Sequence, residues 1–216
     1  MSNKNVTKFS LLALCCLMMS AIAPEAASAN VSLFGTRETM SNNISPFVKW
    51  TGLLAKEPVD RERMRADCNR VGPGCMYNQW EQLISKARTL PRINQLSFIN
   101  REMNRGRYIV DPENWGREDY WESVYEFLMR DGDCEDFAIA KYMTLKEVGV
   151  PPEDMRIVIL QDYNLNLMHA VLAVTINGIN YILDNQLQQV VRDTAIHHYE
   201  PIYSINEKHW WRHLPY

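Results

Sequence analysis

The pair Asn177-Gly178 lies between two apolar runs and constrains the fold more than any other part of this chain. The run before it, Met168 to Ile176, and the run after it, Ile179 to Leu183, have the composition of β-strands. Asn-Gly between two such runs predicts a type I′ turn, because both central residues of that turn need a positive φ. The chain is therefore expected to form an antiparallel hairpin, with an earlier strand at Ile157 to Leu160.

A two-residue turn also fixes which residues face each other across the hairpin. Ile176 then faces Ile179, and Val171 faces Asp184. His169 lies on the same face as Val171 because strand side chains alternate, and Asp184 becomes its diagonal neighbour. A three-residue loop would turn Asp184 to the other face. The register therefore predicts that His169 and Asp184 meet, provided that the turn has two residues.

A second informative stretch is Asp131 to Ala138, where a single cysteine is surrounded by carboxylates. Asp133 is a good N-cap residue, which makes Cys134 the first residue of a helix that is expected to end at Gly149. The N-terminus of a helix favours a thiolate, whereas the neighbouring carboxylates disfavour it. A histidine, a metal ion or both would resolve this conflict.

Cys134, His169 and Asp184 are the residue types that acyl transfer through a thioester requires. Cys134 would attack a carbonyl carbon, His169 would pair with the thiolate and protonate the leaving amine, and Asp184 would orient the imidazole. The alternative is an inert buried thiol and a core histidine, and the hairpin register argues against it. The remaining histidines are expected at the surface or in packing: His197, His198, His209 and His213.

The N-terminal half of the chain has the periodicity of helices. Apolar residues recur at helical spacing in three segments: Ile44 to Leu54, Asn78 to Thr89 and Arg92 to Asn104. An aromatic and acidic segment follows, from Pro112 to Tyr125, and its aromatic residues either pack against the domain or present a recognition surface. We interpret the three helical segments as parts of the core.

The first residues have the pattern of a secretory signal. Two lysines precede the apolar run from Leu11 to Ala23, and Ala27-Ser28-Ala29 fits a cleavage site, so residues 1–29 are predicted to be removed. A lipoprotein signal through Cys15 or Cys16 is a weaker alternative, because a bulky residue precedes each cysteine. The apolar run is too short to remain as a membrane anchor, so no direct membrane insertion is expected. Residues 30–216 are expected to form one exported domain.

Three cysteines remain after cleavage, an odd number for an oxidising compartment. Cys68 and Cys75 flank a turn-rich segment and could close a short disulfide loop, although both could also stay reduced. No CxxC or HxxxH spacing lies near these two cysteines in the sequence, which argues against zinc. The formal net charge is −3, or about −4 after cleavage, and this argues against nucleic acid as a partner.

The motifs resemble the bacterial transglutaminase-like cysteine proteinases, most closely the periplasmic adhesin proteases of the LapG type. The matching pieces are Asp111, Trp115-Gly116, Asp119-Tyr120-Trp121, Glu126-Phe127, Gly132 to Tyr142, His169 to Leu172 and Leu183-Asp184-Asn185. The resemblance implies an α+β fold with a papain-like or transglutaminase-like core. In such a fold the N-terminal half is helical and the nucleophile helix packs on an antiparallel sheet. It also implies peptide-bond hydrolysis rather than crosslinking.

Other expectations follow from this resemblance. The substrate would be a large repeat-containing surface adhesin, cut near its N-terminus at a paired-alanine site, so that the adhesin is released and the biofilm disperses. An inner-membrane receptor that senses cyclic di-GMP would hold the activity back, and we predict that it contacts Trp115 or Trp121. Calcium would bind Asp133 and Glu135, with Asp136 as a third ligand, and further oxygens would have to complete its coordination.

Two alternative functions stay open on the sequence. A transglutaminase or a cell-wall amidohydrolase would use the same Cys-His-Asp site on a different substrate. A catalytically silent module would instead bind a membrane receptor through the aromatic segment around Trp115 and Trp121.

Overall fold

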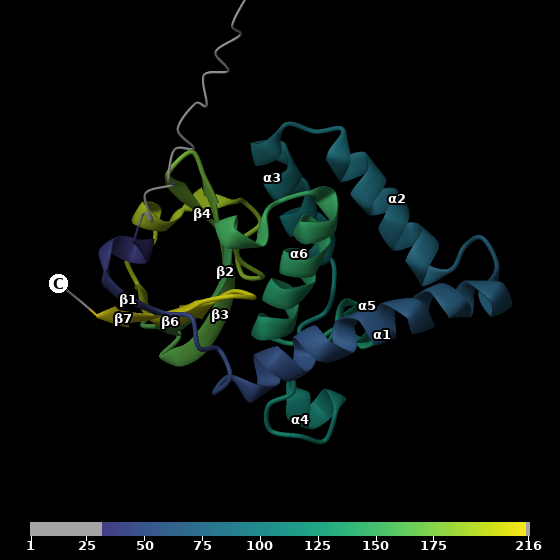
Figure 1. Ribbon diagram of the computed structural model, residues 1–216, viewed down its shortest axis with the longest axis horizontal. Helices are drawn as coiled ribbons and strands as arrows, with labels where there is room; N and C mark the ends of the chain where they lie inside the picture. Colours follow the sequence, from purple (N-terminus) through teal and green to yellow (C-terminus); the bar gives the residue numbers. More distant parts are fainter. Residues whose placement is uncertain (1–31, 215–216) are drawn as a thin grey trace, which may run out of the picture.

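The computed structural model describes residues 32–214, which form a mixed α+β fold with a seven-stranded sheet (Figure 1). The strand order is β1-β7-β6-β2-β3-β4-β5, and every pair of neighbouring strands is antiparallel. The strands are β1 (Arg37–Ser41), β2 (Met155–Asp162), β3 (Leu167–Ile176), β4 (Ile179–Leu183), β5 (Val191–Arg192), β6 (Tyr199–Ile205) and β7 (Trp210–Leu214). Helix α6 lies between the sheet and the other helices, in agreement with its contacts to β2, β3 and α3.

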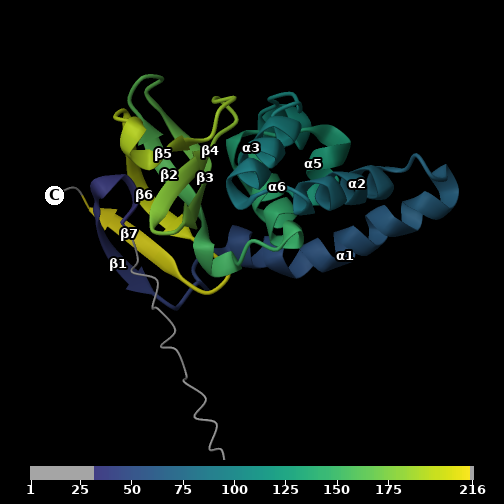
Figure 2. The same ribbon diagram turned by 90° about the horizontal axis from the view of Figure 1, so that it is seen from above.

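The α-helices of the described residues are α1 (Val48–Val71), α2 (Met76–Arg88), α3 (Arg92–Met103), α4 (Asp111–Asn114), α5 (Val124–Arg130) and α6 (Cys134–Val148). Short 3₁₀ helices lie at Leu33–Gly35, Pro152–Asp154 and Asp193–Ala195. Viewed from above, the helices gather on one side of the sheet and α1 extends along them (Figure 2). The expected helical N-terminal half and antiparallel sheet are confirmed.

Helix α6 begins where the sequence predicted. Asp133 is its N-cap in an extended conformation, Cys134 is its first residue, and Gly149 ends it with a φ of 102°. Residues 136–145 are all buried, because α6 packs on the sheet on one side and on α2, α3 and α5 on the other. The helix therefore holds Cys134 at the junction between the sheet and the helices.

The predicted hairpin is confirmed. Asn177 and Gly178 both have positive φ, 51° and 75°, and Ile176 pairs with Ile179. The pairing continues to Leu172 opposite Leu183, so Asp184 follows the last paired residue of β4 in the predicted register. The turn has two residues, and the alternative three-residue loop is excluded.

Helix α1 is much longer than the segment that the apolar pattern predicted. It starts at Val48 and continues through Pro58 to Val71, whereas the periodic apolar residues end at Leu54. Its second half is rich in charged residues that form ion pairs within the helix: Arg61 with Glu57, Arg63 with Asp60, Arg65 with Glu62 and Arg70 with Asp67. Such pairs stabilise a helix that has no continuous apolar stripe.

Strands β1 and β7 were not predicted, because neither sequence alternates apolar and polar residues, although the burial of β7 does alternate. They pair with each other, with Arg37 opposite Leu214, although they lie near opposite ends of the chain. His213 is buried between Thr36 Oγ1 at 2.8 Å and Ser204 Oγ at 2.9 Å, so it packs the sheet edge as expected.

Cys68 and Cys75 are joined by a disulfide bond that links the end of α1 to the start of α2. The predicted signal, residues 1–29, lies outside the described residues, as do Cys15 and Cys16. Within residues 32–214, no helix has the length and hydrophobicity needed to cross a membrane.

Candidate active site

Cys134 is held against the sheet at the start of α6. Its side chain is partly buried, and its sulfur lies 3.3 Å from Oε2 of Glu135. The backbone N–H of Ala170, in β3, lies close enough to favour the thiolate. The sulfur therefore lies beside the residue that follows His169.

The surroundings of the sulfur oppose ionisation. Burial raises the pKa of the Cys134 thiol well above its usual range, and the carboxylates of Glu135 and Asp133 raise it further. The N–H of Ala170 and the helix start act in the opposite direction but are outweighed. A positive charge beside the sulfur would favour ionisation of the thiol.

His169 and Asp184 meet as the register predicted. His169 Nε2 lies 2.9 Å from Oδ1 of Asp184, and both side chains are buried. Oδ1 also accepts the backbone N–H of Gln186 at 2.9 Å, and Oδ2 accepts the hydroxyl of Tyr199 at 2.7 Å. Burial acts to raise the pKa of Asp184, but these hydrogen bonds lower it below the usual range. Asp184 therefore stays ionised and fixes the orientation of the His169 ring.

Four acidic side chains gather beside Cys134. Ligand oxygens of Asp111, Asp119 and Glu135 lie within 4.8 Å of one another, and Asp133 adjoins them through the backbone N–H of Asp111. Oδ1 of Asp111 and Oδ1 of Asp133 are buried and make no hydrogen bond to any described residue. Burial, followed by the neighbouring Glu135, raises the pKa of Asp133 to about 8.

This acidic group fits a calcium ion. Calcium binds six to eight hard oxygen ligands, and two of the buried oxygens here have no other partner. Lys49 forms an ion pair with Asp119 at the exposed edge of the group, and its charge also acts to lower the pKa of Asp111, although burial outweighs it. A bound divalent cation would relieve both the repulsion among these acids and the charge around Cys134.

Asp136 differs from the other acids because its oxygens are already used. Oδ1 accepts the backbone N–H of Glu122 at 2.9 Å, and Oδ2 accepts that of Asp133 at 3.1 Å. It is fully buried with Asp111 and Glu122 in an inner acidic group, and burial raises its pKa well above the usual range. A Cβ added at Gly132 would lie 2.4 Å from Oδ2 of Asp136, so this position requires glycine. Asp136 primarily shapes the start of α6.

Comparison with known proteins places this site in a family. The family model of the bacterial transglutaminase-like cysteine proteinases matches residues 55–215. The chain belongs to this family. Calcium-bound LapG of Legionella pneumophila is 36% identical, with a TM-score of 0.58, over 63% of this chain and 77% of LapG. EGTA-treated LapG is 31% identical with the same TM-score, over 80% of this chain and 87% of LapG. No curated protein sequence matches significantly.

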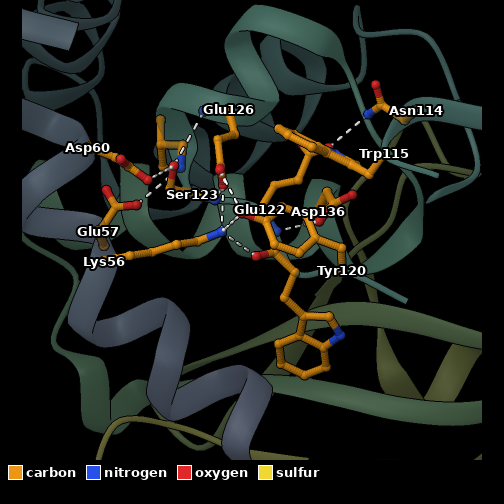
Figure 3. Close-up of polar contacts among 12 residues, drawn as sticks. Lys56, Glu57, Asp60, Asn114, Trp115, Tyr120, Glu122, Ser123, Glu126 and Asp136 are labelled. Atoms are coloured by element: carbon orange, nitrogen blue, oxygen red, sulfur yellow. Dashed lines mark hydrogen bonds and ion pairs between the residues drawn. The ribbon is translucent and has the colours of Figure 1, made fainter. Parts of the chain in front are cut away.

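In this cysteine proteinase, a polar network holds the segment that carries Asp119 (Figure 3). Lys56 of α1 donates to the hydroxyl of Tyr120 and the carbonyl of Trp121, both at 2.8 Å, and to Glu126 at 2.5 Å. Glu57 and Asp60, also from α1, accept from the backbone of Val124 and the hydroxyl of Ser123. The charged middle of α1 thereby fixes the loop that completes the acidic group.

The two tryptophans that were predicted to bind a receptor lie in different environments. Trp121 is only 8% exposed and packs edge-to-face on Trp50 at 6.2 Å, so it offers little surface to a receptor, and its predicted contact stays a prediction. Trp115 is partly exposed, and its ring lies 4.3 Å from the guanidinium of Arg130. Its indole N–H also donates to Glu122.

Three residues of the site were not assigned from the sequence. Asp111 and Asp119 belong to the motifs that carry the family resemblance, but their spacing gave no reason to place them near Glu135. Tyr199 reaches Asp184 from the start of β6, although β2 and β3 lie between β6 and β4 in the sheet, so no local pattern links the two residues.

Proposed function

We propose that this protein is a periplasmic, calcium-dependent cysteine endopeptidase with Cys134, His169 and Asp184 as its catalytic residues. The observation that carries the proposal is the sulfur of Cys134 lying against Ala170 of β3, next to a His169 that Asp184 holds at 2.9 Å. Membership of a cysteine proteinase family supports hydrolysis of a peptide bond.

Each catalytic residue has a distinct task. Because Nε2 of His169 faces Asp184, Nδ1 is the nitrogen that takes the proton from the sulfur of Cys134. The thiolate attacks the carbonyl carbon, and the backbone N–H of Cys134 at the start of α6 stabilises the resulting oxyanion. His169 then protonates the leaving amine, and it later activates the water that hydrolyses the thioester. Asp184 stabilises the imidazolium throughout.

We further propose that Asp111, Asp119, Asp133 and Glu135 hold calcium. The ion would supply the positive charge that the thiol of Cys134 needs, and its binding would ionise Asp133 fully. Support comes from the two buried oxygens without hydrogen bonds and from the calcium-bound form of the similar LapG. Asp136, predicted from the sequence as a third ligand, supports this group from the inner side.

The substrate that fits this proposal is a large repeat-containing surface adhesin, cut near its N-terminus at a paired-alanine site. Its release would promote biofilm dispersal, and an inner-membrane receptor for cyclic di-GMP would control access to the protease. Because Trp121 is buried, the receptor would contact Trp115. Unchanged receptor binding after Trp115→Ala would remove this part of the proposal.

The test is cleavage of an adhesin segment that contains the paired alanines. Cys134→Ala should abolish cleavage while circular dichroism and the melting temperature stay close to those of the unchanged protein. Ser85→Ala, at an exposed position of α2, is the control and should cleave normally. Cleavage retained by Cys134→Ala would sink the proposal.

An excess of a small primary amine and isolated cell wall distinguish the alternative functions. Stable amine-linked product would favour a transglutaminase, and release of muropeptides would favour a cell-wall amidohydrolase. Failure of Cys134 to react with iodoacetamide in the presence of calcium would favour a catalytically silent binding module.

A further inference from the structure

The segment Tyr108-Ile109-Val110 has the composition of a strand but belongs to no sheet. Aromatic and β-branched residues favour extended chain, and this run lies between α3 and α4 in the helical half. Its only strand pairing within residues 32–214 is an isolated parallel bridge between Tyr108 and Gly132. The side chains of Tyr108 and Val110 are 56% and 43% exposed, so packing of the core does not account for them.

Two contacts fix this segment along the residues that lead to the nucleophile. The backbone N–H of Ile109 donates to the carbonyl of Gly132 at 2.9 Å. Just before it, Nε of Arg107 donates to Oδ2 of Asp131 at 2.8 Å. The segment is therefore tied to the chain that enters helix α6 immediately before Cys134.

The alignment of the two chains brings the segment level with the nucleophile. Counting on from the bridge by two residues on each chain places Val110 level with Cys134. One residue further, ligand oxygens of Asp111 and Glu135 lie within 4.8 Å of each other, which agrees with this alignment. A chain that lay along the outer side of the segment would therefore pass close to the start of α6.

The outer side of the segment has free backbone groups. In extended chain, the N–H and C=O of successive residues point to opposite sides, so Ile109 points toward Gly132 whereas Tyr108 and Val110 point away. Within the described residues, the N–H and C=O of Tyr108 and the N–H of Val110 make no hydrogen bond. The C=O of Val110 is already used, because it accepts from the first turn of α4. Two donors and one acceptor thus face outward beside the candidate active site.

Resting on the protease function proposed above, we propose that the outer side of residues 108–110 is the substrate-docking edge. An extended stretch of the substrate pairs with it as an added strand. The N–H groups of Tyr108 and Val110 donate to substrate carbonyls, and the C=O of Tyr108 accepts one substrate N–H. Such pairing recognises the main chain of the substrate, so the cut stretch has to be extended and unpaired with the rest of its own domain.

The first test removes the outward N–H of Val110. This residue has a φ of −71°, within the range of proline, so Val110→Pro deletes the donor without straining the backbone. We measure binding of the adhesin segment with the paired alanines to the inactive Cys134→Ala protein in saturating calcium. The dissociation constant should rise about fivefold, as expected for the loss of one hydrogen bond. Unchanged binding would overturn the proposal.

Val110→Ala is the matched comparison, because it shortens the side chain but keeps the N–H. Its loss of affinity should be clearly smaller, and an equal loss would assign the effect to the side chain and overturn pairing through the backbone. Because Val110 adjoins Asp111, the rate at which iodoacetamide modifies Cys134 is measured in Val110→Pro protein that keeps its cysteine. An unchanged rate shows that the site is intact, and after a changed rate the second test decides.

The second test changes the substrate and leaves the docking edge as it is. Amides near the paired alanines are replaced by esters one at a time, which removes a single N–H from the peptide. Since Tyr108 offers the one outward carbonyl of residues 108–110, one ester position should weaken binding about fivefold and its two neighbours much less. Equal effects at all positions, or none, would overturn the proposal.

The two tests also separate this inference from the proposed function, because binding is measured in protein that cannot cleave. The expected ester pattern without cleavage by the unchanged protein would refute the protease and support the docking edge. Cleavage by the unchanged protein together with a uniform ester series would refute the docking edge and support the protease.

Discussion

Asp184 and Asp133 are two carboxylates of the candidate active site, and they differ in their hydrogen bonds and in the direction of their pKa shifts. Both oxygens of Asp184 accept hydrogen bonds, and the pKa of this carboxyl is lowered although it is buried. Oδ1 of Asp133 makes no hydrogen bond to a described residue, its neighbours are acids, and its pKa is raised to about 8.

This difference shows which half of the site the protein completes with its own groups. The half with His169 and Asp184, the histidine half, is preorganised by β3, β4 and β6 through fixed hydrogen bonds. The half with Cys134 and the acids beside it, the cysteine half, is built from groups that repel one another, and the proposed calcium ion would offset this repulsion so that the thiol can ionise. The two halves should therefore respond differently to mutation, chelation and pH.

The largest effect is expected from breaking the histidine half. Asp184→Asn keeps the shape of the side chain and removes its charge, so we expect kcat/KM for the adhesin segment to fall by about a thousandfold. Asp193→Asn is the control, because Asp193 is a buried acid whose carboxylate accepts from Asn180 and the backbone of Phe34 rather than from His169. A loss of less than tenfold for Asp184→Asn would show that the imidazole needs no anionic partner.

Removal of the cation should break the cysteine half. We expect chelation to lower cleavage by roughly a hundredfold, and calcium but not magnesium to restore it, because magnesium demands a smaller octahedral site. Glu135→Gln should raise the calcium concentration needed for half-maximal activity, whereas Glu118→Gln, at an exposed position of the same loop as Asp119, should not. Equal rescue by magnesium would contradict a dedicated calcium site.

A smaller loss of activity is expected when Asp184 loses only one of its hydrogen bonds. Tyr199→Phe removes one of its hydrogen-bond donors while His169 and Gln186 remain, so we expect about a tenfold loss in kcat/KM. The acidic limb of the pH–activity profile should move upward, since a donor that lowers the pKa of Asp184 is lost. Tyr163→Phe is the control, because its hydroxyl pairs with the exposed Glu200. An unchanged profile would mean that Tyr199 only packs.

The smallest effect concerns stability. The pKa of Asp133 is raised to about 8 in the folded chain from roughly 3.9 in the unfolded chain. Between these values only the folded chain holds the proton, so the melting temperature of the calcium-free protein should fall as pH rises from 5 to 8. Saturating calcium, which binds the ionised carboxylate, should weaken this dependence. A calcium-free protein whose stability rises across this range would refute the assignment.

Turn and helix-capping rules, applied to the sequence, predicted the contact of His169 with Asp184 and the start of α6. The Asn177-Gly178 turn set the register that joins His169 to Asp184, and Asp133 before Cys134 set the helix boundary. Both predictions depend on residues close together in the sequence, where turn chemistry and helix capping decide the conformation.

The same rules could not predict contacts between segments that are distant in the sequence. Asp119 lies near Glu135 because Lys56 of α1 holds the loop that carries Asp119, and Tyr199 reaches Asp184 from β6 across β2 and β3. The length of α1 and the burial of Trp121 also depend on packing between elements. A single sequence contains the residues for these contacts but no local signal that pairs them.

The position of Asp184 relative to His169 depends on the number of residues between them in the hairpin, more than on which residues these are. Side-chain alternation gives each residue of β3 and β4 one of two faces, so adding or deleting one residue after His169 would send Asp184 to the opposite face. Many exchanges within this segment preserve that parity, whereas no single-residue insertion or deletion does. Across related proteins, the count of residues between these two positions should therefore change only in even steps, even where the residues themselves diverge.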